Sequence, residues 1–288
     1  MDFNEYQLEA ATTDQHPENR EHALMIPILG LAGEAGTLAS EYKKFLRDGP
    51  AHKLINEQVC EELGDILWYI SNVASKFGLK LDDVAQYNLK KVRDRFLGTE
   101  GPTFFDACFP ETEQLPREFE ICFSEKGEQG NLRVAMTWNG QTVGNPLTDA
   151  AYDDDGYRYH DVFHLSYATY LAWSPVTRRN LKRKRRSDKR VDEVEDGGRA
   201  WVFEEAIAAL CYDHARKHNF YVGIDSLDFD LLKTIKSLTS GLEVRVRSAR
   251  EWESAILAGY RVWQKLCEHR GGYVKCDLSQ RLLQFREA

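Results

Sequence analysis

The residues best suited to chemistry are acids on two stretches in the N-terminal third of the chain. The first stretch, GLAGEAGTLASEYKKFL, carries Glu34 and Glu41. The second, EELGDILWYI, carries Glu61, Glu62 and Asp65. Apolar residues recur at helical spacing in both, so both are predicted to be packed helices. Residues three, four and seven apart share a helix face, which puts Glu34 with Glu41 and Glu62 with Asp65.

Carboxylates that meet between packed helices need a cation or a proton, because buried negative charges repel one another. A hard divalent ion with oxygen ligands suits such a site, and we expect magnesium, with manganese as a substitute. The alternative is a pair of amphipathic helices whose acids face water. Apolar residues surround Glu62 and Asp65, which favours a buried helix, whereas Glu61 is the acid expected to face water.

Composition indicates a globular chain of one large or two ordinary domains. The 288 residues are 42% hydrophobic and 11% aromatic, which is enough for packed cores. The net charge of −8 argues against a general nucleic-acid coat protein, although a local basic patch could bind nucleic acid. No run approaches about 18 consecutive apolar residues, the N-terminus is polar, and the six cysteines lack CxxC spacing. We therefore expect no membrane span, no signal peptide and a cytoplasmic protein with reduced thiols.

The fold is predicted to be mainly α, with an all-helical bundle over residues 1–97. Four helices are expected there, over about 4–12, 22–46, 54–77 and 81–96. The turn RDGP at 47–50 separates the two acidic helices. Residues 98–118 contain three prolines and two glycines, and are predicted to be a linker or strap whose phenylalanines pack against another part of the protein.

Residues 119–288 are predicted to form a mostly helical α+β domain with a small antiparallel hairpin. The segments EFEICFSE at 118–125 and LRVAMTW at 132–138 alternate in polarity around a turn-like connection, which is typical of a hairpin. The segment QTVG after Asn139-Gly140 is a candidate third strand. Helices are expected over about 158–172, 199–218, 226–239 and 248–269, and a short strand over 242–248.

The stretch RRNLKRKRRSDKR at 178–190 is the one strong charge run, and an acidic segment follows it. A solvated loop is the expected structure. The alternative is a contact with phosphate or nucleic acid.

Three N-terminal segments carry a family pattern: NEYQLEAATT, GLAGEAGTLASEYKK and EELGDILWYISNVASKFGLKLDDVAQYNLKKVRDRF. They resemble the MazG-like all-α nucleoside triphosphate pyrophosphohydrolases, over about residues 3–97. The signature of that family is a Glu-x-x-Glu helix followed by a Glu-x-x-Asp helix. The resemblance implies cleavage of a nucleoside triphosphate between the α and β phosphates, giving a monophosphate and pyrophosphate, with magnesium held by four acids.

Position by position, the resemblance assigns Glu34, Glu62 and Asp65 as metal ligands. The chain departs from the pattern at Thr37, where the second acid of the family is replaced by a neutral hydroxyl. Glu41 lies one turn further along the same face and is a candidate substitute. Three outcomes stay open: weaker metal binding, a changed substrate, or a degenerate site that senses nucleotides without turnover.

A carboxylate that is not fully engaged by metal is expected to take the proton of the attacking water, and Glu41 and Glu61 are the candidates. The segment NLKKVRDRF supplies Asn88, Lys91 and Arg95 on one helical stripe, and the resemblance implies that they bind the anionic substrate. The alternative is a solvated helix face. The family also assembles as homodimers or homotetramers, so a homo-oligomer is implied.

The second half of the chain also has a family likeness. The segments FFDACFPETEQLPREFEICF and DGYRYHDVFHLSYATYLAWSPVTRRNLKRKRR resemble the C-terminal domain that is fused to a bacterial subset of these proteins. The likeness implies no particular chemistry. A nucleotide-sensing or interaction role for this domain is the alternative to a purely catalytic protein.

A second candidate site in this half joins His160 and His164 with Glu205. The two histidines are spaced i, i+4, with Asp161 beside them, and such pairs can hold a transition metal. A phosphate or nucleotide sensor site is an alternative, since the basic run follows. Ordinary hydrogen-bonding histidines are the simplest alternative. His214 and His218 repeat the same spacing later in the chain.

Overall fold

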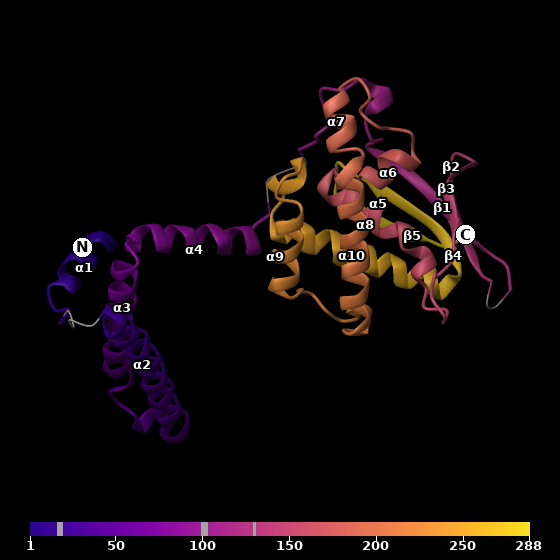
Figure 1. Cartoon of the computed structure of the whole chain (residues 1–288). Coiled ribbons are helices and arrows are strands. Elements are labelled where there is room, and N and C mark those ends of the chain that lie inside the picture. Colours follow the sequence, from indigo (N-terminus) through magenta and orange to yellow (C-terminus); the bar gives the residue numbers. More distant parts are fainter. Residues whose placement is uncertain (16–19, 99–102, 129–130) are drawn as a thin grey trace. The chain divides into compact units, whose positions relative to one another are not determined.

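The computed structural model describes residues 1–15, 20–98, 103–128 and 131–288. The chain divides into two compact units, Met1–Val92 and Arg93–Ala288, both drawn in Figure 1. The first unit is helical, and the second combines helices with an antiparallel sheet. The predicted fold class, mainly α with a small antiparallel sheet, is confirmed.

The first unit is built on two long helices, α2 (Arg20–Asp48) and α3 (Ile55–Lys76), which pack against each other (Figure 1). A short 3-10 turn reverses the chain between them. Gly30 fixes their approach, because a Cβ at this position would lie only 2.3 Å from the Tyr69 ring. The Tyr69 ring therefore lies directly on the backbone of α2. All four helices predicted for this unit are observed.

Helix α1 (Phe3–Ala11) is fastened to the end of α3 by one side chain. The Gln7 amide nitrogen donates to Ser75 Oγ at 2.9 Å. The Gln7 carbonyl oxygen accepts the Leu81 N–H at 2.7 Å, at the start of α4 (Leu81–Phe96). Gln7 thus ties together three helices that share few buried apolar contacts.

The first unit leaves much apolar surface exposed. Pro27, Ala74 and Leu81 are the apolar residues that its described part buries, whereas Leu29 on α2 is 63% exposed. Residues Ala23–Ala51 are also long and apolar enough to cross a membrane, with a mean hydropathy of 1.4. The sequence contains no uninterrupted apolar run of membrane-spanning length, which is why no span is expected. This segment passes on its length and average hydropathy, although it contains acidic residues.

The second unit contains a five-stranded antiparallel sheet in the order β3-β2-β1-β4-β5 (Figure 1). Its strands are β1 (Glu118–Lys126), β2 (Arg133–Trp138), β3 (Gln141–Leu147), β4 (Gly271–Asp277) and β5 (Leu282–Arg286). The predicted hairpin is observed as β1 and β2, with Cys122 opposite Thr137, and the candidate third strand is β3. Strands β4 and β5 were not predicted. They place C-terminal residues beside β1, where Val274 pairs with Ile121.

Helices α5 (Asp161–Leu171) and α10 (Ala249–His269) pack on each other and on β4 and β5. Aromatic side chains fill the space between them: Phe163 stacks on Tyr260 with ring centroids 4.5 Å apart. The remaining helices are α6 (Pro175–Asn180), α7 (Lys189–Val194), α8 (Gly198–Arg216) and α9 (Phe229–Leu238). Apolar residues of α5, α8, α9 and α10 pack with those of the sheet in the core of the second unit.

One prediction for this unit is wrong. The expected strand over 242–248 is a 3-10 turn, Glu243–Val246, in which Arg245 N–H bonds to Leu242 O at 3.1 Å. The Glu243 N–H donates to the Glu195 carboxylate at 3.1 Å, so the alternating sequence needs no strand partner. The segment predicted to be a linker or strap over 98–118 packs, from residue 103 onward, into the second unit, as its phenylalanines indicate: Phe104 and Phe105 lie against the core and Leu115 is buried in it. Residues 99–102 lie outside the described residues.

The basic run is also not the solvated loop that the sequence predicts. Arg178 is buried and its guanidinium lies 2.7 Å from Asp106. Arg185 is buried between Asp196, at 2.7 Å, and Glu243, at 2.6 Å. These charges therefore belong to the interior of the second unit.

Candidate active site

Glu62 lies within a group of four acids that α2 and α3 contribute. Its carboxyl group shares a hydrogen bond with that of Glu34 across the helix pair. Glu61 and Asp65, on the same helix as Glu62, are close enough to act on it electrostatically. Glu34 and Glu62 are half-buried, whereas Glu61 and Asp65 are exposed. The structure thus places Glu34 and Glu62 in contact, with Glu61 and Asp65 near enough to act on the charge of Glu62.

This grouping follows from the antiparallel packing of the two helices. Glu34 lies one turn beyond Gly30 on α2, and Glu62 lies two turns before Tyr69 on α3. The close approach of Gly30 and Tyr69 therefore sets the register that lets the two carboxyl groups meet.

The electrostatics of Glu62 are those of a crowded carboxylate. Burial raises the pKa of Glu62, and the neighbouring Glu34 carboxylate raises it further. Glu61 and Asp65 act in the same direction. Neither Glu34 nor Glu62 forms an ion pair with a lysine or arginine among the described residues. The group therefore has unbalanced negative charge and only oxygen donors, which fits a hard divalent cation.

Glu41 is separate from this group. Its buried carboxylate is paired with Lys44, one turn along α2, and lies 3.5 Å from Nε2 of His52. The hydrogen bond from Lys44 lowers the pKa of Glu41 despite its burial. This pairing counts against the expectation that Glu41 replaces the missing second acid, because its charge is already balanced.

Thr37 occupies the position where the family pattern has its second acid, and it carries no charge. The Thr37 hydroxyl donates to the backbone carbonyl of Gly33 at 3.3 Å, and the side chain is exposed. Its proton is therefore used within α2. The acid group keeps one carboxylate on α2 and three on α3.

The three residues expected to bind substrate separate in the structure. Asn88 and Lys91 are exposed on α4. Arg95 is buried in the second unit, where its guanidinium lies 2.9 Å from Glu253 and donates to Leu227 O at 2.8 Å. The expectation that Arg95 faces substrate is therefore corrected: its charge is neutralised in the interior.

Sequence reasoning missed Tyr6. Burial raises the pKa of Tyr6, and the Asp65 carboxylate raises it further, so this α1 side chain lies near the acid group. The pattern offered no signal for it, because α1 is joined to α3 through Gln7 and not through a periodic apolar face.

Comparison with known proteins assigns both units. The MazG nucleotide pyrophosphohydrolase domain matches residues 22–96, and the MazG C-terminal domain matches residues 100–288. The chain belongs to the MazG family. Its N-terminal domain is a hydrolase domain that acts on nucleotide pyrophosphate bonds, and MazG enzymes generally depend on a divalent metal ion.

One phage protein is similar to part of this chain. The gene 37 protein of Mycobacterium phage L5 is 34% identical over 101 residues, which are 33% of this chain and 89% of that protein. No solved structure matches the chain.

The second candidate site lies in the MazG C-terminal domain. Nε2 of His164 lies 3.4 Å from the Glu205 carboxylate, and Nε2 of His160 lies 3.9 Å from it. Burial opposes protonation of His164, but the Glu204 and Glu205 carboxylates raise its pKa to about 10. Burial opposes ionisation of Glu205, but His164 lowers its pKa to about 2. The structure thus brings the three predicted residues together, and it adds Glu204.

The second histidine pair has a different setting. The rings of His214 and His218 stack with centroids 4.1 Å apart. Nδ1 of His214 bonds to the Tyr221 hydroxyl at 2.8 Å, and Nδ1 of His218 bonds to the His214 carbonyl. Among the described residues, the cluster of three metal-ligating side chains within ligand distance of one another is His160, Asp161 and His164, and the acids of α2 and α3 do not form such a cluster in this structure.

Proposed function

We propose that the MazG domain hydrolyses a nucleoside triphosphate between the α and β phosphates, with magnesium as the metal ion. The observation that supports this most is the contact of Glu34 with Glu62, with Glu61 and Asp65 beside them. The Glu34 and Glu62 carboxylates pair with no lysine or arginine among the described residues, so they supply oxygen donors for a hard cation and for the phosphates that such a cation carries.

Glu34, Glu62 and Asp65 would hold the ion, since they supply carboxylate oxygens from two facing helices. A bound magnesium ion supplies charge neutralisation on the phosphate oxygens and lowers the pKa of a coordinated water. The residues do the rest: Glu34 and Glu62 fix the position of the site between α2 and α3, and Glu61 is exposed and free to accept the proton of the attacking water.

Asn88 and Lys91 are proposed to bind the phosphates. Both are exposed on α4, and Lys91 carries the positive charge that a triphosphate requires. Within the described part of a single chain, α4 makes no extensive contact with α2 or α3. A second copy of the chain would have to bring these residues to the acids, so this part of the proposal depends on oligomerisation.

We propose that the protein is a homodimer or homotetramer built through the apolar surface of α2. Leu29, Ile26 and Met25 are each more than half exposed on that helix. A second copy of the chain accounts for this surface better than a membrane does. Helix α2 also carries Glu34 and Glu41, and charged side chains are costly inside a bilayer. Nucleic acid is not proposed as a partner: the buried ion pairs of Arg178 and Arg185 remove two cations of the basic run from any such contact.

Hydrolysis in ¹⁸O-labelled water tests the bond that is cleaved. Attack of water on the α-phosphorus puts the label in the nucleoside monophosphate and leaves the pyrophosphate unlabelled. We expect that result, with magnesium present and with product formation abolished by a chelator. Label in pyrophosphate or in inorganic phosphate would contradict the proposed reaction, because it would show attack at the β- or γ-phosphorus.

A further inference from the structure

The MazG C-terminal domain contains an open cavity of about 430 Å³ that the proposed reaction does not use. Residues of β3 line one part of it, and residues of α5, α6 and α8 line the rest. Its lining includes the nitrogen and oxygen donors of His160, Asp161 and Glu205, and the cations of Arg179 and Lys182.

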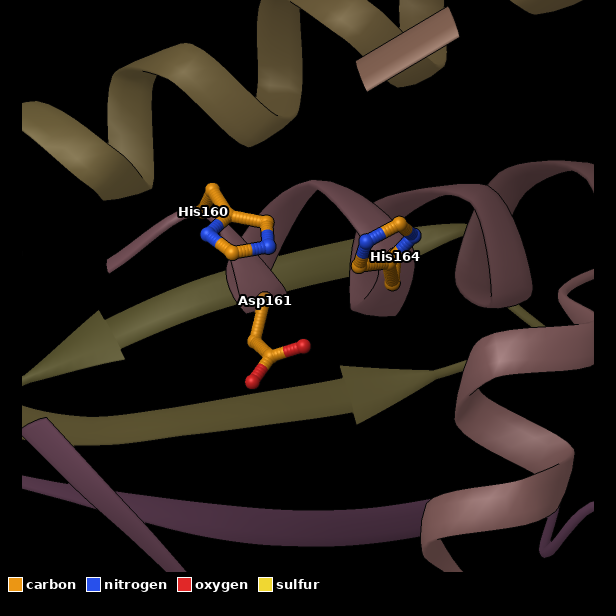
Figure 2. A group of neighbouring side chains, drawn as sticks. All are labelled: His160, Asp161 and His164. Atoms are coloured by element: carbon orange, nitrogen blue, oxygen red, sulfur yellow. The ribbon is translucent and has the colours of Figure 1, made fainter. Parts of the chain in front are cut away.

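Three side chains at the start of α5 lie at this cavity: His160 and Asp161 line it, and His164 is buried next to them. Figure 2 shows the His160 and His164 rings next to each other, with the Asp161 carboxylate below them. One donor atom from each of the three lies within 4.8 Å of the others. Asp161 is buried, and in the part of the chain that the structure describes it forms no ion pair with a lysine or arginine.

Hydrogen bonds at Nδ1 orient both imidazole rings and leave Nε2 of each ring available. Nδ1 of His160 bonds to the Tyr157 carbonyl at 2.9 Å, and Nδ1 of His164 bonds to Glu204 at 2.9 Å. Glu204 is fully buried and also accepts the Val176 N–H at 2.8 Å. Protein metal sites hold their histidines in this way, with a carbonyl or carboxylate on one nitrogen and the metal on the other.

The two Nε2 atoms are turned toward one oxygen, Oε2 of Glu205, at 3.9 Å and 3.4 Å. Nε2 of His164 is buried and makes no hydrogen bond of good geometry. Donors around a metal with bonds of about 2.0–2.2 Å lie roughly 3–4 Å from one another, so these separations fit a shared ion. Glu205 is itself fixed, because its Oε1 accepts the Trp201 indole N–H at 3.1 Å.

The cations of the cavity face the same space. The Arg179 guanidinium lies 4.0 Å from the centre of the Trp201 ring, which places it next to the residue that holds Glu205. Arg179 and Lys182 are exposed, and neither forms an ion pair with an acid within the described residues. Cations without acidic partners beside a metal site are suited to a phosphate group.

We propose that this cavity is a second ligand site, which holds a divalent transition-metal ion on His160, His164, Asp161 and Glu205 and takes a phosphate-bearing small molecule on that ion. Nitrogen ligands distinguish it from the carboxylate group of the N-terminal domain, which has only oxygen donors. The ligand class is set by Arg179 and Lys182. The proposal does not depend on the reaction of the N-terminal domain.

Cobalt binding to the full-length, chelator-stripped protein tests the metal half. The visible absorption of Co²⁺ reports nitrogen ligation, and the variant Glu62→Gln removes the contribution of the N-terminal acids. In that background we expect about one Co²⁺ per chain with a nitrogen-ligand spectrum, lost in His160→Ala and weakened at least about tenfold in Glu205→Gln.

The chain supplies a matched control. His214→Ala with His218→Ala removes a histidine pair of the same spacing whose rings stack on each other and which lies outside the cavity lining, and this variant should bind Co²⁺ as the parent does. Circular dichroism without metal checks that each variant is folded. If His160→Ala does not fold, Glu205→Gln decides the question, since its amide can keep the Trp201 hydrogen bond. Unchanged Co²⁺ binding in the folded variants would overturn the site.

Inorganic phosphate tests the ligand half. Added to the cobalt-loaded protein, it should change the visible spectrum with saturation, and Arg179→Ala should weaken that effect by about tenfold or more. Arg216→Ala, an exposed arginine on α8, is the control and should have no effect. No spectral response to phosphate, or an equal response in Arg179→Ala, would overturn the ligand class.

Discussion

Glu62 illustrates how neighbouring residues decide what a side chain can do. Its carboxyl group is half-buried, bonded to Glu34 and flanked by Glu61 and Asp65, so its charged form is disfavoured until a cation arrives. Glu41, on helix α2, is paired with Lys44 and lies beside His52, so its charge needs no bound cation. The difference between these two acids lies in their partners and not in their residue type.

The raised pKa of Glu62 predicts a pH dependence of stability. The folded protein binds this proton more tightly than the unfolded chain, so in the presence of a chelator the unfolding free energy should fall as the pH rises from about 4.5 through the raised pKa. Below that range the contribution is fully present. Urea unfolding of wild type and Glu62→Gln across this range isolates the effect.

Magnesium should reverse the loss of stability above the raised pKa in wild type only, because it binds the ionised form. An identical pH profile for wild type and Glu62→Gln would show that the carboxyl group is not crowded in solution.

The buried arginines of the basic run carry a second prediction at this scale. Asp196→Asn removes the carboxylate that contacts Arg185 at 2.7 Å in the interior, so we expect a loss of about 3 kcal/mol or more of unfolding free energy. Asp213→Asn is the control, because its pair with Lys217 is largely exposed and should contribute little. Chemical denaturation measures both. Equal effects would mean that Arg185 gains water or another partner.

Sequence reasoning succeeded for residues where spacing carries the information. Glu34, Glu61, Glu62 and Asp65 follow from helical period, and the structure groups them. It failed for Arg95. This residue lies on the same face of its helix as Asn88 and Lys91, but it is buried because it pairs with Glu253, more than 150 positions away in the chain. It also missed the role of Glu204, whose contact with His164 joins two helices that no local pattern connects.

Helix pairing is the element-scale feature that the acid group depends on. The α2–α3 contact has few buried side chains, and its register is set where the Tyr69 ring lies on Gly30. Gly36, also in α2, has open space around it. These two glycines therefore separate the effect of packing from the effect of helix propensity.

We expect Gly30→Ala to loosen the α2–α3 pair and to reduce hydrolysis, because its Cβ displaces the Tyr69 ring at a cost of about 1–3 kcal/mol. Gly36→Ala should instead stabilise α2 by roughly 1 kcal/mol. Hydrogen–deuterium exchange of α2 and α3 peptides measures both. Equal protection in the two variants would show that Tyr69 moves aside freely and does not set the register.

Elements were predictable from sequence where their pattern is local. The long helices and the β1–β2 hairpin follow from apolar period and turn residues. Strand β4 was missed because it begins with Gly271 and Gly272, and two consecutive glycines after a helix predict a loop. In the structure both glycines have positive φ, 129° and 139°. Its place beside β1 is a long-range pairing, and the turn at 243–246 shows the converse, an alternating segment without a partner strand.

At the scale of the whole molecule, the two units differ in how they are stabilised. The C-terminal unit has an extensive buried core, whereas the N-terminal unit exposes apolar side chains along α2. A helix with such a face is completed by another surface. The proposed homo-oligomer supplies that surface.

A charge on the exposed α2 face should therefore dissociate the oligomer. Leu29→Glu introduces a carboxylate where the side chain is 63% exposed in one chain, so the isolated chain should tolerate it. Light scattering after size exclusion should show a multimer for wild type and a smaller species for Leu29→Glu. Lys43→Glu, at an exposed polar position of the same helix, is the control. A monomeric wild type would contradict the proposal, as would an unchanged mass for Leu29→Glu.

The most direct test of the central claim is pyrophosphate release from a panel of ribo-, deoxy-, modified and alarmone nucleotides, with magnesium or with a chelator. We predict magnesium-dependent release from at least one nucleotide, and a loss of about 100-fold or more in a folded Asp65→Ala variant. Glu57→Gln, an exposed acid on the same helix, should keep wild-type turnover. No release by wild type, or full turnover in Asp65→Ala, would contradict catalysis at the Glu34–Glu62 group.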